Sequence, residues 1–230
     1  MNNNIGILDP DGENKNPLTN DIYSDEYKKL ANIWKKFPAY ENAENYINLI
    51  KKHQVLLVVS GTGSGKTVLF PKYALHALDY MGKIAITLPK QIITRSAAEF
   101  SAKTLDVELG KDVGYKYRGS PKDKQSKDTK LLYATDGTIV AKLLNDPLLE
   151  EFNLVIIDEA HERKVQIDFL LYLLRRAISK RNDLKIIIMS ATINTEIFKD
   201  YFKDYDFYNL NIGGRTNYPI ESIFLKENIK

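Results

Sequence analysis

The chain is 230 residues long and 43% hydrophobic, which suffices for a sizeable core, and one domain fits this length best. Its formal net charge of +3 permits a polyanionic partner without requiring one. The absence of cysteine excludes disulfides, thiolate metal sites and a cysteine nucleophile. We recognise neither a secretion signal nor an apolar run long enough to span a bilayer, so we expect an intracellular protein that is not bound to a membrane.

The N-terminal part differs in composition from the rest. Residues 1 to about 25 are rich in Asn, Asp, Gly and Pro and hold few large apolar side chains. Such a segment buries too little surface to offset the entropy lost on ordering. We therefore expect a flexible polar arm over residues 1–36, followed by one globular domain over residues 37–230.

From Tyr40 onward, short apolar runs alternate with longer amphipathic segments, which is typical of a mostly parallel sheet with helices on both faces. Helical spacing in 99–109 and 167–180 predicts core-facing helices. Pro71 should cost a hydrogen bond in the helix expected after residue 66. The fold class is therefore α/β. The expected strands are 55–59, 83–87, 130–135, 153–158, 185–192 and 218–224.

The stretch VSGTGSGKTVLF (59–70) follows the first expected strand and precedes an amphipathic segment. It fits the phosphate-loop pattern G-x-x-x-x-G-K-[ST], which requires this strand-loop-helix setting. Glycines let successive N–H groups point inward, the lysine reaches the β and γ phosphates, and the threonine ligates magnesium. A glycine turn with an incidental lysine is the alternative, and the setting favours the phosphate loop. The candidate nucleotide contacts are Gly61, Thr62, Gly63, Ser64, Gly65, Lys66 and Thr67.

A second motif, LVIIDEAHER (154–163), delivers two carboxylates to the C-terminal end of an apolar strand, where open α/β sheets bind ligands. Asp158 suits a magnesium ligand, and Glu159 suits a base that orients and deprotonates the attacking water. A solvated acidic helix start is the alternative. The phosphate loop earlier in the chain favours the catalytic interpretation.

Together the motifs resemble the first RecA-like domain of the DEAH-box helicases of superfamily 2. The resemblance covers Phe37 to the C-terminal end. It implies a P-loop NTPase with a RecA-like three-layer sandwich around a mostly parallel sheet. It also implies ATP and Mg²⁺ as cofactors and movement along a single strand of RNA, on which DEAH-box relatives mostly act. The matching stretches are FPAY (37–40), GTGSGKT (61–67), TLPK (87–90), VGYKYRG (113–119), TDG (135–137), DEAHER (158–163), SAT (190–192) and GGRTNYPIE (213–221).

The resemblance also implies roles for single residues. Lys66 and Thr67 would bind phosphate and magnesium, Asp158 would bind magnesium, and Glu159 would be the catalytic base. His161 would help to sense the nucleotide. Ser190 and Thr192 would couple hydrolysis to strand separation, while Lys90 and Thr135 would touch the phosphate backbone of the strand, a contact that carries affinity and not sequence specificity.

Some positions depart from the family pattern. Thr62 stands where the family usually has Glu, and Lys90 and Gln91 replace two strand-contacting arginines, so strand affinity is expected to differ. Phe100 aligns with an arginine that stacks on the adenine ring. Its ring can stack in the same way, and the alternative, a core phenylalanine, is the one that residue type favours.

The family's second RecA-like domain has no counterpart in this sequence. Its arginines stabilise the transferring phosphate, a contribution of about 10³ to 10⁵ in rate in related enzymes. We therefore expect a fragment or excised domain of a larger helicase, weakly active alone and dependent on that second domain. An activating protein partner also fits the resemblance.

Three alternatives stay open. The stretch 115–130 packs basic residues around two tyrosines as in a strand-binding loop, but Asp123 and Asp128 interrupt the charge and favour a solvated loop. Two functions compete with that of an RNA helicase. The domain could serve as a non-enzymatic nucleotide-gated scaffold, or belong to a helicase that acts on DNA. Richness in Asn, Lys and Ile suggests an AT-biased genome, as in a large DNA virus or a parasite, with the cytoplasm, nucleus or virion as locations.

Overall fold

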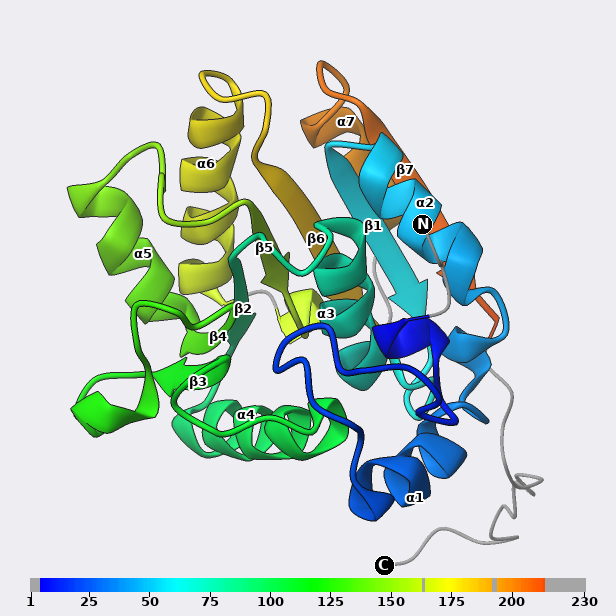
Figure 1. Ribbon diagram of the computed structural model, residues 1–230. Coiled ribbons are helices and arrows are strands. Elements are labelled where there is room, and N and C mark those ends of the chain that lie inside the picture. The colour runs from blue at the N-terminus through cyan, green and yellow to red at the C-terminus, as the bar shows by residue number, and fades with distance from the viewer. Residues whose placement is uncertain (1–4, 163, 192–193, 214–230) are drawn as a thin grey trace, which may run out of the picture.

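The computed structural model describes residues 5–162, 164–191 and 194–213 (Figure 1). In this part of the chain, seven strands form one sheet in the order β3-β4-β2-β5-β6-β1-β7, and every pair is parallel. The expected α/β class is confirmed. The strands are β1 (Val55–Ser60), β2 (Ile84–Leu88), β3 (Val113–Lys116), β4 (Leu131–Thr135), β5 (Leu154–Ile157), β6 (Lys185–Ser190) and β7 (Phe207–Ile212). The helices are α1 (Asp25–Trp34), α2 (Ala43–Lys52), α3 (Lys66–Ala77), α4 (Gln91–Leu105), α5 (Asp136–Asn145), α6 (Val165–Ile178) and α7 (Thr195–Tyr201).

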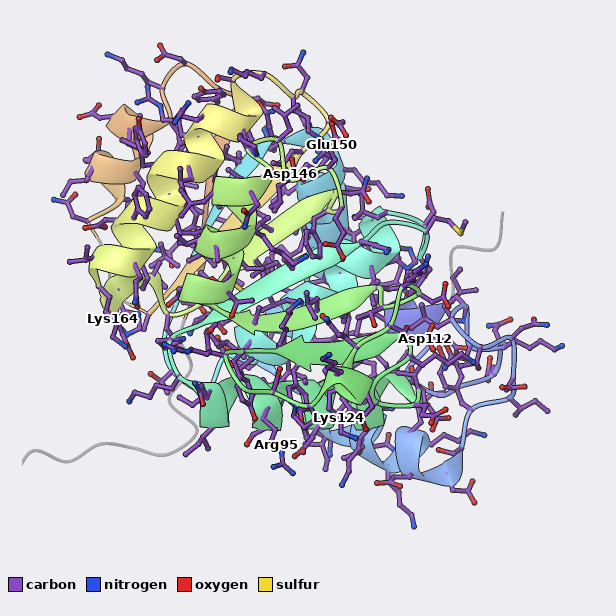
Figure 2. All side chains as sticks on the ribbon, turned by 90° about the vertical axis from the view of Figure 1, so that its left-hand side faces the viewer. Arg95, Asp112, Lys124, Asp146, Glu150 and Lys164 are labelled. Atoms are coloured by element: carbon purple, nitrogen blue, oxygen red, sulfur yellow. The ribbon has the colours of Figure 1, made fainter. Side chains whose placement is uncertain are left out.

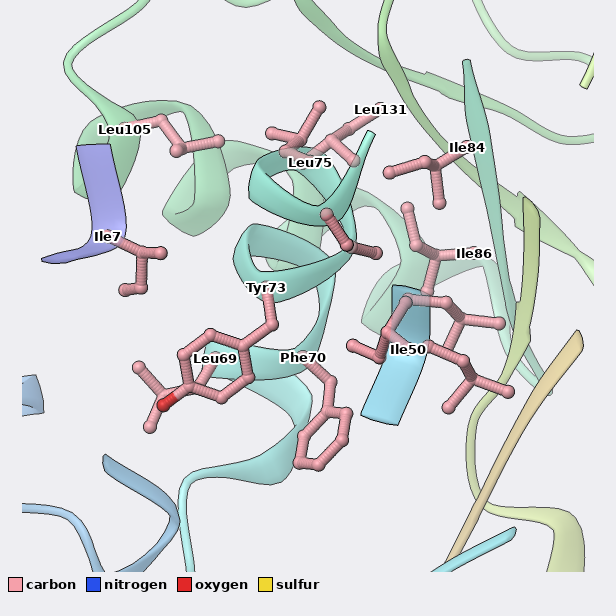
Figure 3. Close-up of a cluster of buried hydrophobic side chains, with 14 of the residues drawn as sticks. Ile7, Ile50, Leu69, Phe70, Tyr73, Leu75, Ile84, Ile86, Leu105 and Leu131 are labelled. Atoms are coloured by element: carbon pink, nitrogen blue, oxygen red, sulfur yellow. The ribbon is translucent and has the colours of Figure 1, made fainter. Parts of the chain in front are cut away.

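Two hydrophobic layers enclose the sheet. In β1, Leu56 and Val58 face the layer built from α2, α3 and α4. Val55 and Leu57 face the layer built from α5, α6 and α7. Because both faces of the strand are covered, its residues read as one apolar run rather than as an alternation. Figure 3 shows α3 in the first layer, with Phe70, Tyr73 and Leu75 directed into the cluster.

The central strands lie where the apolar runs predict them, whereas both edge strands escaped prediction. β3 is only four residues long and contains Gly114, which lacks a side chain to pack. β7 alternates exposed and buried residues and carries Asn209 and Asn211, which are poor strand formers. The run 185–192 forms a strand only to Ser190. The expected strand 218–224 lies outside the described residues.

The helices confirm most of the helical spacing that the sequence predicts. α6 lies within the expected range 167–180 except for an earlier start at Val165. α4 ends sooner than the expected 99–109, because Asp106 adopts a left-handed conformation (φ 56°) that stops it. α3 continues through Pro71, which is buried on this helix.

The expectation of a flexible arm over residues 1–36 is wrong for residues 5–36. Ile7, Tyr23, Tyr27 and Trp34 are each at most 5% exposed and belong to the first core layer. They are few, which is why the composition hid them, but α1 and the turns before it bring them together. In Figure 1 this N-terminal segment, drawn in blue, crosses in front of α3 and passes the end of α4 before it enters α1.

Polar side chains also attach this segment to the rest of the domain. Asn16 donates through Nδ2 to the carbonyl of Leu105 at 2.9 Å. Ser24 donates from its backbone N and its hydroxyl to the Asp106 carboxylate at 2.7 and 2.8 Å. These hydrogen bonds join the segment to the end of α4, so its polar residues help to hold it against the domain.

Among the described residues, no helix is both long and apolar enough to cross a bilayer.

Candidate active site

The loop between β1 and α3 has the backbone that the glycine pattern predicts. Gly63 and Gly65 have φ angles of 83° and 88°, which side-chain-bearing residues seldom adopt. The hydroxyls of Ser60 and Ser64 lie 2.8 Å apart and close the loop at its base. Lys66 opens α3 and is only 5% exposed. An array of N–H groups at a helix N-terminus with a lysine beside it suits a polyphosphate.

Asp158 follows β5 and is fully buried. Its Oδ1 accepts a hydrogen bond from the Glu159 N–H at 2.9 Å. Burial raises its pKa to about 6, against the opposing influence of the Thr67 hydroxyl, while Glu159 adds to the increase and Lys66 lowers it. The sheet therefore brings Lys66, Thr67 and Asp158 together, although they are about ninety residues apart in sequence.

This group of residues fits a magnesium ion. The second oxygen of Asp158, Oδ2, is enclosed and accepts no hydrogen bond from a described residue. A buried carboxylate oxygen without a partner is costly unless a ligand completes it. Mg²⁺ takes oxygen ligands from one or two carboxylates and from phosphates, and a carboxylate beside a hydroxyl provides such oxygens.

Glu159 has an unusual backbone conformation. Its φ is 56°, in the left-handed region, which costs of the order of 1 to 3 kcal/mol for a residue with a side chain. Its Oε2 lies 3.3 Å from Nε2 of His161, and Nδ1 of His161 lies 3.4 Å from the Ala191 N–H. Because Nδ1 faces an N–H donor, the ring proton belongs on Nε2, which faces the Glu159 carboxylate. His161 thus links the carboxylate to the end of β6.

One of the two residues expected to couple hydrolysis to movement, Ser190, lies at this same strand end. Ser190 ends β6, is fully buried and sits next to Ala191, which contacts His161. Thr192 lies outside the described residues.

A separate groove opens beside β3, β4 and α5, with a volume of about 800 Å³. Thr135 lines it and shares a hydrogen bond of 2.8 Å with the Thr138 hydroxyl. Lys116, Tyr117 and Arg118 also line it. The first part of the stretch 115–130 therefore faces the same space as Thr135. We call the part of this lining formed by Lys116, Tyr117, Arg118, Thr135, Thr138 and Lys142 the cationic groove. Asp146 and Glu151 also line it, and Glu151 pairs with Lys142, so among the described residues Lys116 and Arg118 carry its unpaired positive charge.

The rest of that stretch lies elsewhere. Lys124 pairs with Asp123 at 2.9 Å and lies beside Arg95 on the α4 side of the molecule (Figure 2). Lys164, at the start of α6, marks the edge where the strands end, whereas Asp112 and Glu150 lie at the opposite edge (Figure 2). Lys90 is exposed at the start of α4 but does not line the cationic groove.

Comparison with known proteins identifies the family. A model of DEAD/DEAH box helicases matches residues 40–200. The chain belongs to the DEAD/DEAH box helicase family. L540 of Acanthamoeba polyphaga mimivirus, assigned by name as an ATP-dependent RNA helicase, is 51% identical over 96% of this chain. HrpA of Borreliella burgdorferi and human DHX57, also named as ATP-dependent RNA helicases, are 42% and 36% identical over 82% and 90% of it. The chain spans only 32%, 22% and 15% of the lengths of these three relatives.

Family membership explains the RecA-like fold, and the structure corrects one detail of the expected site. Phe100 is 43% exposed on α4, so the alternative of a core phenylalanine is wrong. It lines a small cavity with Thr67 and Val68, directly behind the phosphate loop. An exposed ring at this place is free to contact a bound molecule.

Sequence reasoning missed two features of this helicase-family site. Asp136, in the TDG motif, is 2% exposed, and burial raises its pKa although the Thr87 hydroxyl opposes the increase. The TLPK and TDG motifs therefore meet below the surface. Lys142 of the cationic groove was also missed, although its place one or two turns after Thr135 is the signal that predicts a shared helix face.

Proposed function

We propose that this chain is the ATP-binding motor domain of an ATP-dependent RNA helicase. The observation that carries the proposal is the buried Asp158 oxygen without a partner, beside Thr67 and Lys66 of the phosphate loop. A nucleotide phosphate with its metal ion is the ligand that satisfies such a carboxylate together with a lysine and a row of backbone N–H groups.

In this proposal each residue near the phosphates has one task. The N–H groups of residues 61–67 and the Lys66 ammonium hold the β and γ phosphates, and Thr67 and Asp158 hold Mg²⁺. The metal, when bound, neutralises the charge that develops on the phosphate oxygens. Glu159 orients the attacking water and accepts its proton, and His161, whose Nε2 lies beside the Glu159 carboxylate, keeps that carboxylate in position.

The remaining tasks concern the base and the strand. Phe100 offers its exposed ring to the nucleotide base. Thr135 and Lys90 contact strand phosphates, and the cationic groove continues that path with Lys116 and Arg118. Ser190 and Thr192 transmit the state of the nucleotide to the strand. A second RecA-like domain completes the site in the full helicase, since the chain spans a third or less of its relatives.

RNA is the proposed strand because all three relatives carry that substrate in their names. DNA and a scaffold without turnover are the competing functions. The intact set Lys66, Thr67, Asp158 and Glu159 favours the enzyme over the scaffold.

The test is single-turnover ATP hydrolysis by the 230-residue chain, with and without single-stranded RNA or DNA, beside Glu159→Gln. Without the second domain we expect slow hydrolysis by the parent chain. The variant should lower it by a further 10²- to 10⁴-fold, roughly the value of one general base, while ATP still binds. ATP binding without any hydrolysis in either protein would support the scaffold, and failure to bind ATP would refute the proposal. Stimulation by DNA alone would refute RNA as the strand.

A further inference from the structure

The outer side of the phosphate loop is covered by a segment that has no role in the proposed chemistry. This segment is η2 (Pro38–Tyr40) with Phe37, the residue before it. It lies between α1 and α2 in the chain, about twenty-five residues before the loop it touches. We call Phe37–Ala39 the brace.

Phe37 lies against Gly65. A Cβ atom added at Gly65 would come within 2.5 Å of Phe37 Cδ2 and 2.7 Å of Phe37 Cβ. The phenylalanine side chain therefore rests directly on the Gly65 backbone, on the side where any other residue would carry its side chain. Gly65 thus needs to be glycine for its φ of 88° and also for this contact.

Ala39 makes two backbone hydrogen bonds, one to each side of the loop. Its N–H donates to the carbonyl of Ser64 at 3.0 Å. Its carbonyl accepts from the hydroxyl of Tyr73, on α3, at 2.8 Å. Ala39 itself is fully buried. The brace therefore fixes the loop relative to the helix that follows it.

The bond to Ser64 has a directional consequence. In a trans peptide the C=O and the following N–H point in opposite directions. Because the Ser64 carbonyl is held toward Ala39, the N–H of Gly65 is held away from the brace. Phosphate loops bind phosphate through N–H groups that all point to one side. The brace thus sets the direction of one of these donors before any nucleotide arrives.

We propose that Phe37 is a positioning residue for nucleotide binding, acting through Gly65 and the Ser64–Gly65 peptide. This inference rests on the proposed function, because it presumes that the loop binds phosphate. It extends that function to a residue that touches neither nucleotide nor metal. It also gives the ordered segment ahead of the loop a purpose beyond packing.

The test measures the affinity of the 230-residue chain for Mg·ADP by fluorescence titration, with pyrophosphate as competitor, well below the melting temperature. Phe37→Ala should weaken both ligands by about tenfold, which corresponds to the loss of one well-placed hydrogen bond. Phe37→Leu, which keeps an apolar side chain on Gly65, should restore most of the affinity. Tyr73→Phe should weaken binding by a smaller factor because it frees only the Ala39 carbonyl.

Two controls separate positioning from general loss of stability. Phe198→Ala removes a buried ring from the opposite core layer, and Tyr27→Phe removes a hydroxyl that bonds the carbonyls of Gly6 and Asp9. Both should lower the melting temperature and leave the affinity unchanged. Equal loss of affinity in Phe198→Ala and Phe37→Ala, or none in Phe37→Ala, would overturn the inference.

One more variant, Lys66→Ala, tells the two proposals apart. If the parent chain binds Mg·ADP and Lys66→Ala abolishes binding, the proposed function stands, and an unchanged Phe37→Ala then refutes the brace alone. If the parent chain binds neither Mg·ADP nor pyrophosphate, the proposed function fails and the inference fails with it.

Discussion

Two regions of the molecule are built in opposite ways, although both lie where parallel strands end. One is the cationic groove, and the other is the phosphate loop with Asp158 and Glu159, which we call the nucleotide end. At the nucleotide end the charged side chains are buried: Lys66 is 5% exposed and Asp158 is not exposed at all. The backbone there adopts left-handed angles at Gly63, Gly65 and Glu159. The cationic groove instead opens to solvent between β3, β4 and α5 and has side chains such as Lys116 and Arg118 at its border.

The difference reflects what each region is proposed to hold. Phosphoryl transfer needs charges at fixed positions in a site that excludes water, where electrostatic interactions are strong. Such positions justify backbone strain and a costly buried carboxylate. A strand that must slide needs affinity without a fixed register, which exposed cations provide. Substitutions at the nucleotide end should therefore cause large losses of hydrolysis, whereas substitutions in the cationic groove should cause smaller losses of RNA affinity.

After Glu159→Gln, the largest effect is expected from His161→Ala. The variant removes the contacts of the ring with Glu159 and with the Ala191 N–H, so the carboxylate loses its fixed orientation. We expect hydrolysis to fall about 10- to 100-fold, as for other residues that orient a reacting group, with little change in ATP affinity. Single-turnover hydrolysis and nucleotide titration measure the two quantities separately.

His53→Ala is the matched control for that variant. His53 also contacts a carboxylate, since its Nδ1 lies 2.7 Å from Asp206, but it is placed far from the phosphate loop. Hydrolysis should be unchanged in this control. If His161→Ala hydrolyses ATP at the parent rate, the imidazole does not position Glu159.

An intermediate effect is expected in the cationic groove. Replacing Lys116 and Arg118 with Gln should weaken single-stranded RNA binding by about tenfold at low salt. It should also flatten the plot of log affinity against log salt by roughly 1.4, at about 0.7 per lost phosphate contact. ADP binding should stay as in the parent chain. An unchanged salt slope would show that RNA does not pass through this groove.

The smallest effect is expected in the distal part of the same stretch. Charge reversal of Lys122, Lys124 and Lys127 should change RNA affinity less than twofold, because Lys124 pairs with Asp123 and lies on the α4 side. This triple variant also controls for net charge. A larger loss than in the groove variant would reverse the comparison between the two halves of residues 115–130.

The motifs predicted which residues meet at this edge of the sheet, because each motif follows a buried strand. β1, β5 and β6 are apolar enough to be recognised, and parallel strands bring their carboxyl ends to one edge. The placement of Lys66, Thr67 and Asp158 together follows from this topology. The left-handed φ of Glu159 could not be predicted, because a carboxylate is not the residue type that marks such a conformation.

Predictions failed where tertiary contacts outweigh local composition. The N-terminal segment has a polar composition, yet Trp34 is 2% exposed and the Lys72 ammonium lies 4.9 Å from its ring centroid. Lys72 is itself buried and donates to the Thr104 carbonyl, which no sequence pattern indicates. β7 was missed because it forms by pairing with β1, which lies far away in the sequence. Local patterns report on single elements and not on their partners.

The order of the strands has a consequence during synthesis of the protein on the ribosome. β1 is made before its neighbours β6 and β7, which follow it by about 130 and 150 residues, and Lys185 bonds to a carbonyl of His53, 132 residues earlier. At about 5–20 residues per second, the nascent β1 must wait on the order of ten seconds for either partner. Its apolar run, with the phosphate loop behind it, meanwhile stays without its lateral pairing. An apolar strand without its neighbours is prone to associate with other apolar surfaces until both neighbours have been made.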